Sequence, residues 1–122
     1  MAAEAYEAGM RAFEANAYHQ AVELLRQAAY LAPKDARYRS SLGMLLARNR
    51  EWIHDAVQEV EEAIQLEPTN AAHRGLLAEM LLGQGLRLRA RKTAEAAIAL
   101  DPHEKRARRV LADTAAEDAG GR

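Results

Sequence analysis

Apolar residues and alanines recur at intervals of three and four residues along nearly the whole chain. This spacing places them on one face of an α-helix, which completes a turn in about 3.6 residues. Glycine and proline cluster at the breaks between these stretches, and no alternating run of β-branched residues indicates a strand. The pattern predicts an all-α fold of seven helices with short loops, over residues 2–15, 18–31, 36–49, 52–66, 71–83, 87–99 and 104–117.

The three prolines of the chain each follow the end of a predicted helix. They are Pro33, Pro68 and Pro102, which are 35 and 34 residues apart. A proline lacks a backbone donor and disfavours helix at the residue before it. Asp35 follows the first proline and is predicted to cap the next helix. The prolines therefore mark the boundaries of a repeat.

Small residues recur in register with the prolines. In each unit two alanines stand seven residues apart, and the second stands five residues before the proline. The pairs are Ala21 and Ala28, Ala56 and Ala63, and Ala90 and Ala97. Between the alanines stand Leu25, Val60 and Ala94. Alanines at this spacing let a neighbouring helix approach closely. On the preceding helix, the same contact is expected at Gly9, Gly43 and Ala78.

This pattern resembles the tetratricopeptide-repeat family, whose 34-residue motif has the form W-x2-L-G-x2-Y, then A-x3-F, then P. The resemblance implies an α-solenoid of three helix-turn-helix units, over residues 2–35, 36–70 and 71–104. A capping helix over 105–117 and a flexible tail over 118–122 would follow, so residues 1–117 form a single domain. The middle repeat has one extra residue, which we place between Trp52 and Ala56.

The tryptophan and tyrosine positions of the family motif are lost. The tryptophan falls on Ala5, Arg39 and Arg74, and the tyrosine falls on Ala12, Leu46 and Leu81. The resemblance therefore depends on three repeats in phase with their prolines and not on any single repeat.

The chain of 122 residues has no cysteine, which excludes disulfides, thiolate metal sites and cysteine nucleophiles. The opening MAAEAYEAGM has neither a basic segment nor an apolar run, so no secretory signal is expected. No apolar run approaches 18 residues, so no membrane span is expected. We expect a cytoplasmic location and no membrane partner.

Catalytic chemistry finds little support in the sequence. Ser40 and Ser41 are the only serines, and they lie outside any G-x-S-x-G context. There is no H-E-x-x-H motif and no glycine-rich phosphate loop. The four histidines stand singly near the ends of predicted helices. We therefore expect no enzyme activity, no metal and no cofactor.

Charge is unevenly distributed, although the net charge is only -1. Residues 51–67 hold six acidic and no basic residues, whereas residues 87–109 hold eight basic and three acidic residues. These stretches are either solvated helix faces that partly oppose each other between neighbouring repeats, or a basic surface for an acidic partner. Nucleic-acid binding by RLRARK (87–92) and KRARR (105–109) is a lesser alternative, because net charge and aromatic content are both low.

The resemblance implies a superhelix whose concave wall is formed by the first helix of each pair. The residues that it places there, and that we expect to contact a peptide, are Tyr6, Met10, Phe13, Glu14, Arg37, Ser41, Met44, Arg48, Leu76, Glu79, Leu82, Arg106, Arg109 and Asp113. Phe13 and Leu82 suit the core equally well. The expected partner is a short protein segment with apolar side chains and one or more acidic groups, bound by a scaffold or adaptor module.

Two other functions stay open: a self-associating structural module, with a homodimer as one form, and a small secretion-type chaperone. Family members that clamp the terminal carboxylate of chaperone peptides use lysine, asparagine and arginine donors. In this chain those places hold Tyr6, Met10, Ser41, Ala72 and Leu76. Binding of a chaperone tail in that manner is therefore not expected.

Overall fold

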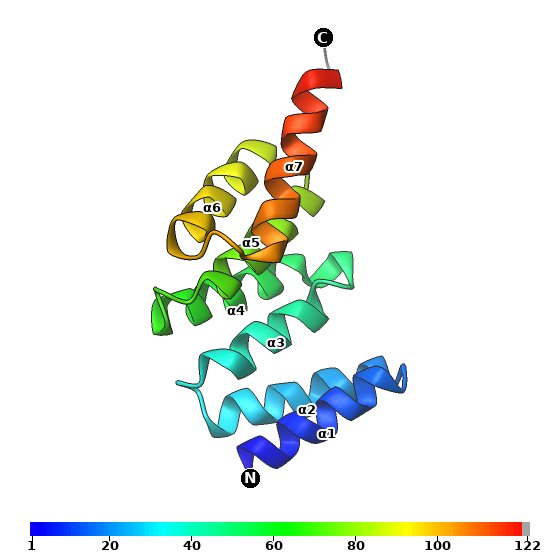
Figure 1. Cartoon of the computed structure of the whole chain (residues 1–122). Helices are drawn as coiled ribbons and strands as arrows, with labels where there is room; N and C mark the ends of the chain where they lie inside the picture. The colour runs from blue at the N-terminus through cyan, green and yellow to red at the C-terminus, as the bar shows by residue number, and fades with distance from the viewer. Residues whose placement is uncertain (121–122) are drawn as a thin grey trace. The chain divides into compact units, whose positions relative to one another are not determined.

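The computed structural model describes residues 1–120 and the side chains of residues 1–116. This part of the chain contains no strand and forms seven α-helices and one short 3₁₀ helix, η1 (Figure 1). The elements are α1 (Ala2–Glu14), α2 (Tyr18–Leu31), α3 (Ala36–Leu46), η1 (Arg50–Trp52), α4 (Ile53–Leu66), α5 (Ala71–Gly83), α6 (Arg87–Leu100) and α7 (Lys105–Gly120). The predicted all-α fold is confirmed.

The chain divides into two compact units, Met1–Glu67 and Pro68–Arg122. Unit 1 holds α1 to α4, which correspond to the first two predicted repeats, and unit 2 holds α5 to α7. The boundary between the units falls at one of the proline turns. The single domain over 1–117 stays a prediction. So does the flexible tail over 118–122, of which residues 121 and 122 lie outside the described residues.

Each proline turn ends in a capping side chain. The residue two positions after each proline accepts a hydrogen bond from a backbone N–H in the first turn of the next helix. The acceptor and donor pairs are Asp35 with Arg37 at 3.0 Å, Asn70 with Ala72 at 3.1 Å, and Glu104 with Ala107 at 2.7 Å. These bonds satisfy amide groups that have no partner inside the helix. The predicted cap at Asp35 is confirmed, and it recurs at both later boundaries.

Glycines allow the helix pairs of unit 1 to cross closely. A Cβ atom added to Gly9 of α1 would collide with Leu25 of α2. A Cβ atom added to Gly43 of α3 would lie 2.6 Å from Cγ2 of Val60 and 2.9 Å from the carbonyl oxygen of Ala56. Close packing of this kind leaves no room for an extra methyl group. The contacts predicted at these two glycines are confirmed.

Unit 2 meets the same requirement with a different pair of residues. The positions that correspond to Gly43 and Val60 hold Ala78 and Ala94, and both are fully buried. The first helix has gained a methyl group, while the second helix has lost a larger side chain. The total volume at the crossing is thus roughly kept, which is the kind of exchange that protein cores tolerate.

Helix α3 is shorter than predicted, because it ends at Leu46 and not at residue 49. The carbonyl of Leu45 accepts a hydrogen bond of 2.5 Å from the hydroxyl of Tyr18 on α2. The side chain of Asn49 accepts the N–H of Glu51 at 3.0 Å and starts η1. The backbone N–H groups of Arg48 and Asn49 bond to the carbonyls of Leu45 and Leu46, so the chain tightens after α3 and these side-chain bonds support the turn.

The extra residue of the middle repeat lies in this turn. Helices α2, α4 and α6 begin at Tyr18, Ile53 and Arg87. Each start lies three residues before the first of the two alanines that stand seven residues apart in that repeat. The extra residue therefore precedes Ile53, so its predicted position between Trp52 and Ala56 is wrong. The turns after α1 and α5 instead contain left-handed residues, Asn16 with φ 62° and Gly85 with φ 81°.

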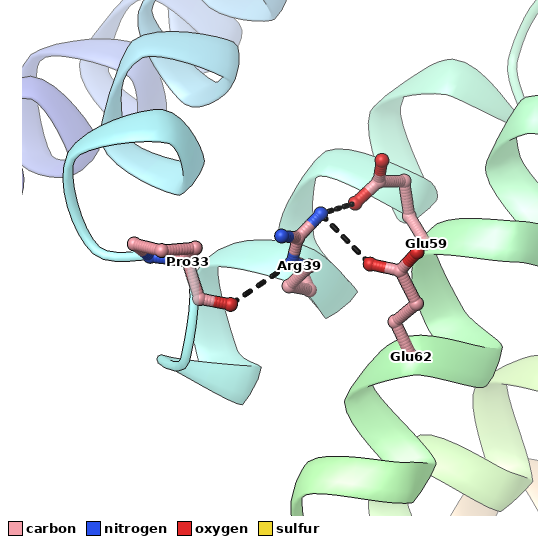
Figure 2. A network of polar contacts seen from close by, with 4 residues as sticks. All are labelled: Pro33, Arg39, Glu59 and Glu62. Carbon is pink, nitrogen blue, oxygen red and sulfur yellow. Dashed lines mark hydrogen bonds and ion pairs between the residues drawn. The ribbon is translucent and has the colours of Figure 1, made fainter.

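Arg39 occupies a position where the family motif has tryptophan, and it joins three parts of unit 1 (Figure 2). Its Nη1 atom lies 3.0 Å from Glu59 and 2.8 Å from Glu62, both on α4. Its Nε atom donates to the carbonyl of Pro33 at 3.2 Å. A charged side chain therefore connects α3 to α4 and to the proline turn, and part of the acidic stretch 51–67 is paired inside unit 1.

Candidate functional site

Two arginine–aromatic contacts join α1 and α3 in unit 1. Cζ of Arg37 lies 5.0 Å from the ring centroid of Tyr6, near the start of both helices. Cζ of Arg48, two residues after the end of α3, lies 5.3 Å from the ring centroid of Phe13 near the end of α1. Because start meets start and end meets end, the two helices run in the same direction. We call this surface the α1/α3 face; its residues are Tyr6, Met10, Phe13, Arg37, Ser41, Met44 and Arg48.

Arg37 is held by two tyrosine rings. Its Cζ atom is 5.0 Å from the ring centroids of both Tyr6 and Tyr38, and these centroids are 5.1 Å apart with the ring planes tilted by 33°. Its Nη2 atom donates to the hydroxyl of Tyr38 at 3.3 Å. This hydrogen bond raises the pKa of Arg37, so the group stays charged at every physiological pH. Cation–π contacts at exposed sites contribute about 0.5–1 kcal/mol each.

Both arginines of the α1/α3 face remain open to solvent. The side chain of Arg37 is 60% exposed, and the carboxylate of Asp35 approaches it only to 3.9 Å. Arg48 is exposed and has no ion-pair partner among the described residues. Stacking on a ring fixes the plane of a guanidinium group, and the N–H groups that are not already bonded stay available to a carboxylate. In Arg37, Nη2 is bonded to the Tyr38 hydroxyl, and the remaining N–H groups are available.

The other predicted residues of this face lie between the two arginine contacts. Met10 stands between Tyr6 and Phe13 on α1, and Ser41 and Met44 stand between the arginines along α3. All three side chains are half-buried, so each keeps some surface toward solvent. Glu14, also predicted for this wall, is exposed at the end of α1.

Unit 2 presents the remaining predicted residues on α5 and α7. Oε1 of Glu79 lies 3.4 Å from Nε of Arg106, so these two charges offset each other. Leu76 is buried, at 6% exposure, and offers little surface to a ligand. Leu82 is half-buried, whereas Arg109 and Asp113 on α7 are exposed. The predicted site residues thus form two sets, one in each unit, and only the set in unit 1 holds arginines against aromatic rings.

Tyr38 was not predicted as part of the site. Its spacing to Leu42 and Leu45 is typical of a core position, and its side chain is indeed only 4% exposed. One face of the ring nevertheless supports Arg37. A ring shared between the core and a surface contact has no separate signal in the sequence.

Membrane-spanning helices and metal-binding clusters are both absent from the residues that the structure describes. None of the helices in this part of the chain combines the length and the apolar character needed to cross a membrane. No group of three histidine, aspartate or glutamate side chains within residues 1–116 is placed to hold a metal ion.

Known proteins resemble this chain in structure. No protein-family model matches the chain, and no curated protein matches its sequence. The tetratricopeptide-repeat (TPR) domain of Sgt2 from Aspergillus fumigatus matches with a TM-score of 0.85 and 19% identity, over 98% of this chain and 80% of that chain. The first TPR of Spaghetti (RPAP3), bound to HSP90 peptide SRMEEVD, matches with a TM-score of 0.86 and 16% identity, over 97% and 93% of the two chains.

A third match is the TPR2B domain of yeast Sti1 in its pHsp70 complex, with a TM-score of 0.85 and 20% identity, over 95% of this chain and 97% of that chain. At these identities the likeness concerns the fold. It agrees with the seven helices of the described residues and with the spacing of their proline turns. The chain therefore has the tetratricopeptide-repeat fold that its sequence pattern predicts.

Proposed function

We propose that this chain is a non-enzymatic protein-interaction module that holds a short peptide segment on the α1/α3 face, in a scaffold or adaptor role. The observation that carries the proposal is the pair of exposed arginines, Arg37 and Arg48, each stacked on an aromatic ring. Arginine and aromatic side chains contribute most of the binding energy in many protein interfaces. Half-buried methionines between them suit apolar ligand side chains, because methionine adapts its shape.

The solved structures of the same fold support a peptide partner. One of them holds an HSP90 peptide and another is a complex with pHsp70. The chemistry of the ligand differs in this chain, because the places used by the family's carboxylate clamp hold Tyr6, Met10, Ser41, Ala72 and Leu76. None of these side chains is cationic. The proposed ligand is therefore held along its length and not by its terminal carboxylate.

Self-association is the competing function. Tyr30 on α2 is 84% exposed and Leu88 on α6 is 68% exposed, and apolar side chains of this size suit a contact with a second copy. Analytical ultracentrifugation at roughly 50 µM separates the two functions, since self-association depends on protein concentration. A monomer favours the interaction module. A dimer that Tyr30→Ser weakens favours self-association.

The test of the proposed site is peptide binding. Twelve-residue peptides selected from a display library against the full chain are measured by fluorescence anisotropy with Met44→Glu and Arg37→Glu variants. Each variant introduces a negative charge on the α1/α3 face and is expected to weaken binding at least about tenfold, which corresponds to about 1.4 kcal/mol. Arg26→Glu is the matched control, because it makes the same change on an exposed residue of α2. Undiminished binding by both face variants, with far-UV circular dichroism unchanged, would reject the site.

A further inference from the structure

The two stacked arginines of the α1/α3 face are separated by a defined length. Tyr6 and Phe13, the rings on which they stack, are seven residues apart on α1. A helix rises 1.5 Å per residue, so the rings are about 10 Å apart along the axis. The Cζ atoms of Arg37 and Arg48 lie 5.0 and 5.3 Å from their ring centroids, so the two guanidinium groups stand about 10–16 Å apart along the face.

The surface between the arginines is uncharged. Met10 fills the middle turn of α1, and Ser41 and Met44 fill the middle turns of α3. The acidic groups nearest in sequence to this face are Glu7 and Glu14, each one residue after a ring, and Asp35. Asp35 accepts the backbone N–H of Arg37, and its Oδ2 atom lies 3.9 Å from Nη2 of Arg37. The face therefore offers two positive positions with an apolar and hydroxyl-bearing surface between them.

The charge of unit 1 restricts the class of partner. Its residues include eleven aspartates and glutamates against seven lysines and arginines, which gives a net charge of −4. A nucleic acid carries one charge on every phosphate and would be repelled by this field. A short peptide with isolated carboxylates meets the two arginines without adding many other negative charges. Complementary charges of this kind determine which ligand binds and in which register.

We infer that the ligand of the α1/α3 face is an extended peptide segment with two carboxylate side chains three to five residues apart and apolar residues between them. An extended chain advances about 3.3 Å per residue, so three to five residues cover about 10–16 Å. One carboxylate binds the open edge of Arg37 and the other binds Arg48, while the intervening side chains contact Met10 and Met44. This inference rests on the proposed function, because it requires a peptide on this face.

The experiment uses the full chain and fluorescein-labelled twelve-residue peptides of leucine and serine that carry two test residues, either glutamate or glutamine. The first peptide has glutamates at positions 4 and 8, the second has glutamates at positions 4 and 5, and the third has glutamines at positions 4 and 8. The first is expected to bind about 25-fold more tightly than the third, from about fivefold for each ion pair. The second peptide can reach only one arginine at a time, so it is expected to bind about fivefold more tightly than the third.

A double-mutant cycle assigns the contacts. Arg37→Gln should weaken binding of the first peptide about fivefold. The same substitution should not change the affinity for a peptide in which the glutamate that Arg37 binds is replaced by glutamine. Arg48→Gln should behave in the same way toward the other glutamate. Arg26→Gln is the matched control and should leave all affinities unchanged. These couplings should shrink when the salt concentration rises, because exposed ion pairs are screened.

The outcomes separate this inference from the proposed function. If the glutamate and glutamine peptides bind with equal affinity and Met44→Glu still abolishes binding, the inferred pair of carboxylates is rejected. The proposed peptide site on the α1/α3 face is then retained. Failure of every peptide, including those from the display selection, overturns both. Tighter binding of a labelled twelve-nucleotide DNA strand than of the first peptide, with loss in Arg37→Gln, also overturns the inference, because the face would then prefer phosphates.

Discussion

Units 1 and 2 share one backbone pattern but differ in the chemistry of their side chains. All six aromatic residues of the chain stand in the first 67 residues. Unit 1 uses three of them to hold Arg37 and Arg48 on the α1/α3 face. Unit 2 has no aromatic residue, and its Arg106 is paired with Glu79. The fold thus requires only the register of small residues and caps, whereas the aromatic residues are free to serve a binding surface.

Arg39 and Arg74 show the same contrast at corresponding positions. Both donate to a proline carbonyl at 3.2 Å, Arg39 to Pro33 and Arg74 to Pro68. Arg39 also has carboxylate partners on the following helix, whereas Arg74 has none there in the part of the chain that the structure describes. The residues of unit 2 that correspond to Glu59 and Glu62 are Thr93 and Ala96. The Nε atom of Arg74 is buried and has no hydrogen-bond partner in the described part of the chain.

The largest effect is expected where the two units solve the same crossing with different residues. Gly43→Ala places a methyl group 2.6 Å from Cγ2 of Val60 and 2.9 Å from the carbonyl oxygen of Ala56, so it should lower the free energy of unfolding by about 1–3 kcal/mol. Urea denaturation followed by circular dichroism measures this loss. Gly83→Ala is the matched control, because a Cβ atom there meets nothing within 4 Å.

Unit 2 also indicates how that loss can be reversed. The pair Gly43→Ala and Val60→Ala reproduces the alanines found at positions 78 and 94. The double variant should therefore lose less stability than the sum of the two single variants, with a coupling above about 0.5 kcal/mol. If the losses of the two single variants add strictly in the double variant, residues 43 and 60 do not compensate each other in the way that the alanines of unit 2 suggest.

A smaller effect is expected from the arginines at the proline turns. Arg39→Gln removes two ion pairs and a bond to Pro33, and it should lower the free energy of unfolding by about 1–2 kcal/mol. Arg74→Gln removes only the bond to Pro68 and should cost less. The difference between the stability losses of these two variants should become smaller in 0.5 M salt, where the ion pairs are screened. Equal losses at low salt would show that Glu59 and Glu62 contribute nothing to stability.

The smallest effect concerns the bond from the Tyr18 hydroxyl to the carbonyl of Leu45. In unit 2, Arg87 stands in the corresponding place, and its Nη2 atom donates to the carbonyl of Thr114 at 3.4 Å. Tyr18→Phe should lower the free energy of unfolding by about 1 kcal/mol near neutral pH. Burial raises the pKa of Tyr18 above its ordinary value, although Arg48 and Arg26 act in the opposite direction. The folded state thus favours the neutral hydroxyl.

The pH dependence of this contribution follows from the direction of that shift. The stabilisation is complete below the unfolded pKa of about 10 and is lost as the pH rises through the higher folded pKa. Denaturation at about pH 8 and pH 11 should therefore show a smaller difference between the wild type and Tyr18→Phe at the higher pH. A difference that does not change with pH would mean that the hydroxyl is not buried as a donor.

The sequence by itself determined the repeat, its boundaries and most of its helices. Prolines at a regular spacing, a capping residue two positions later, and small residues such as Gly9 and Gly43 act within one turn or one helix pair. Such local and periodic features are visible without knowing the partners of each side chain. The face formed by Tyr6, Phe13, Arg37 and Arg48 was also predicted, through the family resemblance.

The tertiary structure alone decided which side chains meet across helices. Tyr18 bonds to Leu45 at the end of α3, Arg39 reaches Glu59 and Glu62, and Tyr38 supports Arg37 from inside the core. Leu76, predicted for the binding surface, is buried instead. These outcomes depend on the distance and rotation between packed helices, which a pattern along one chain does not specify.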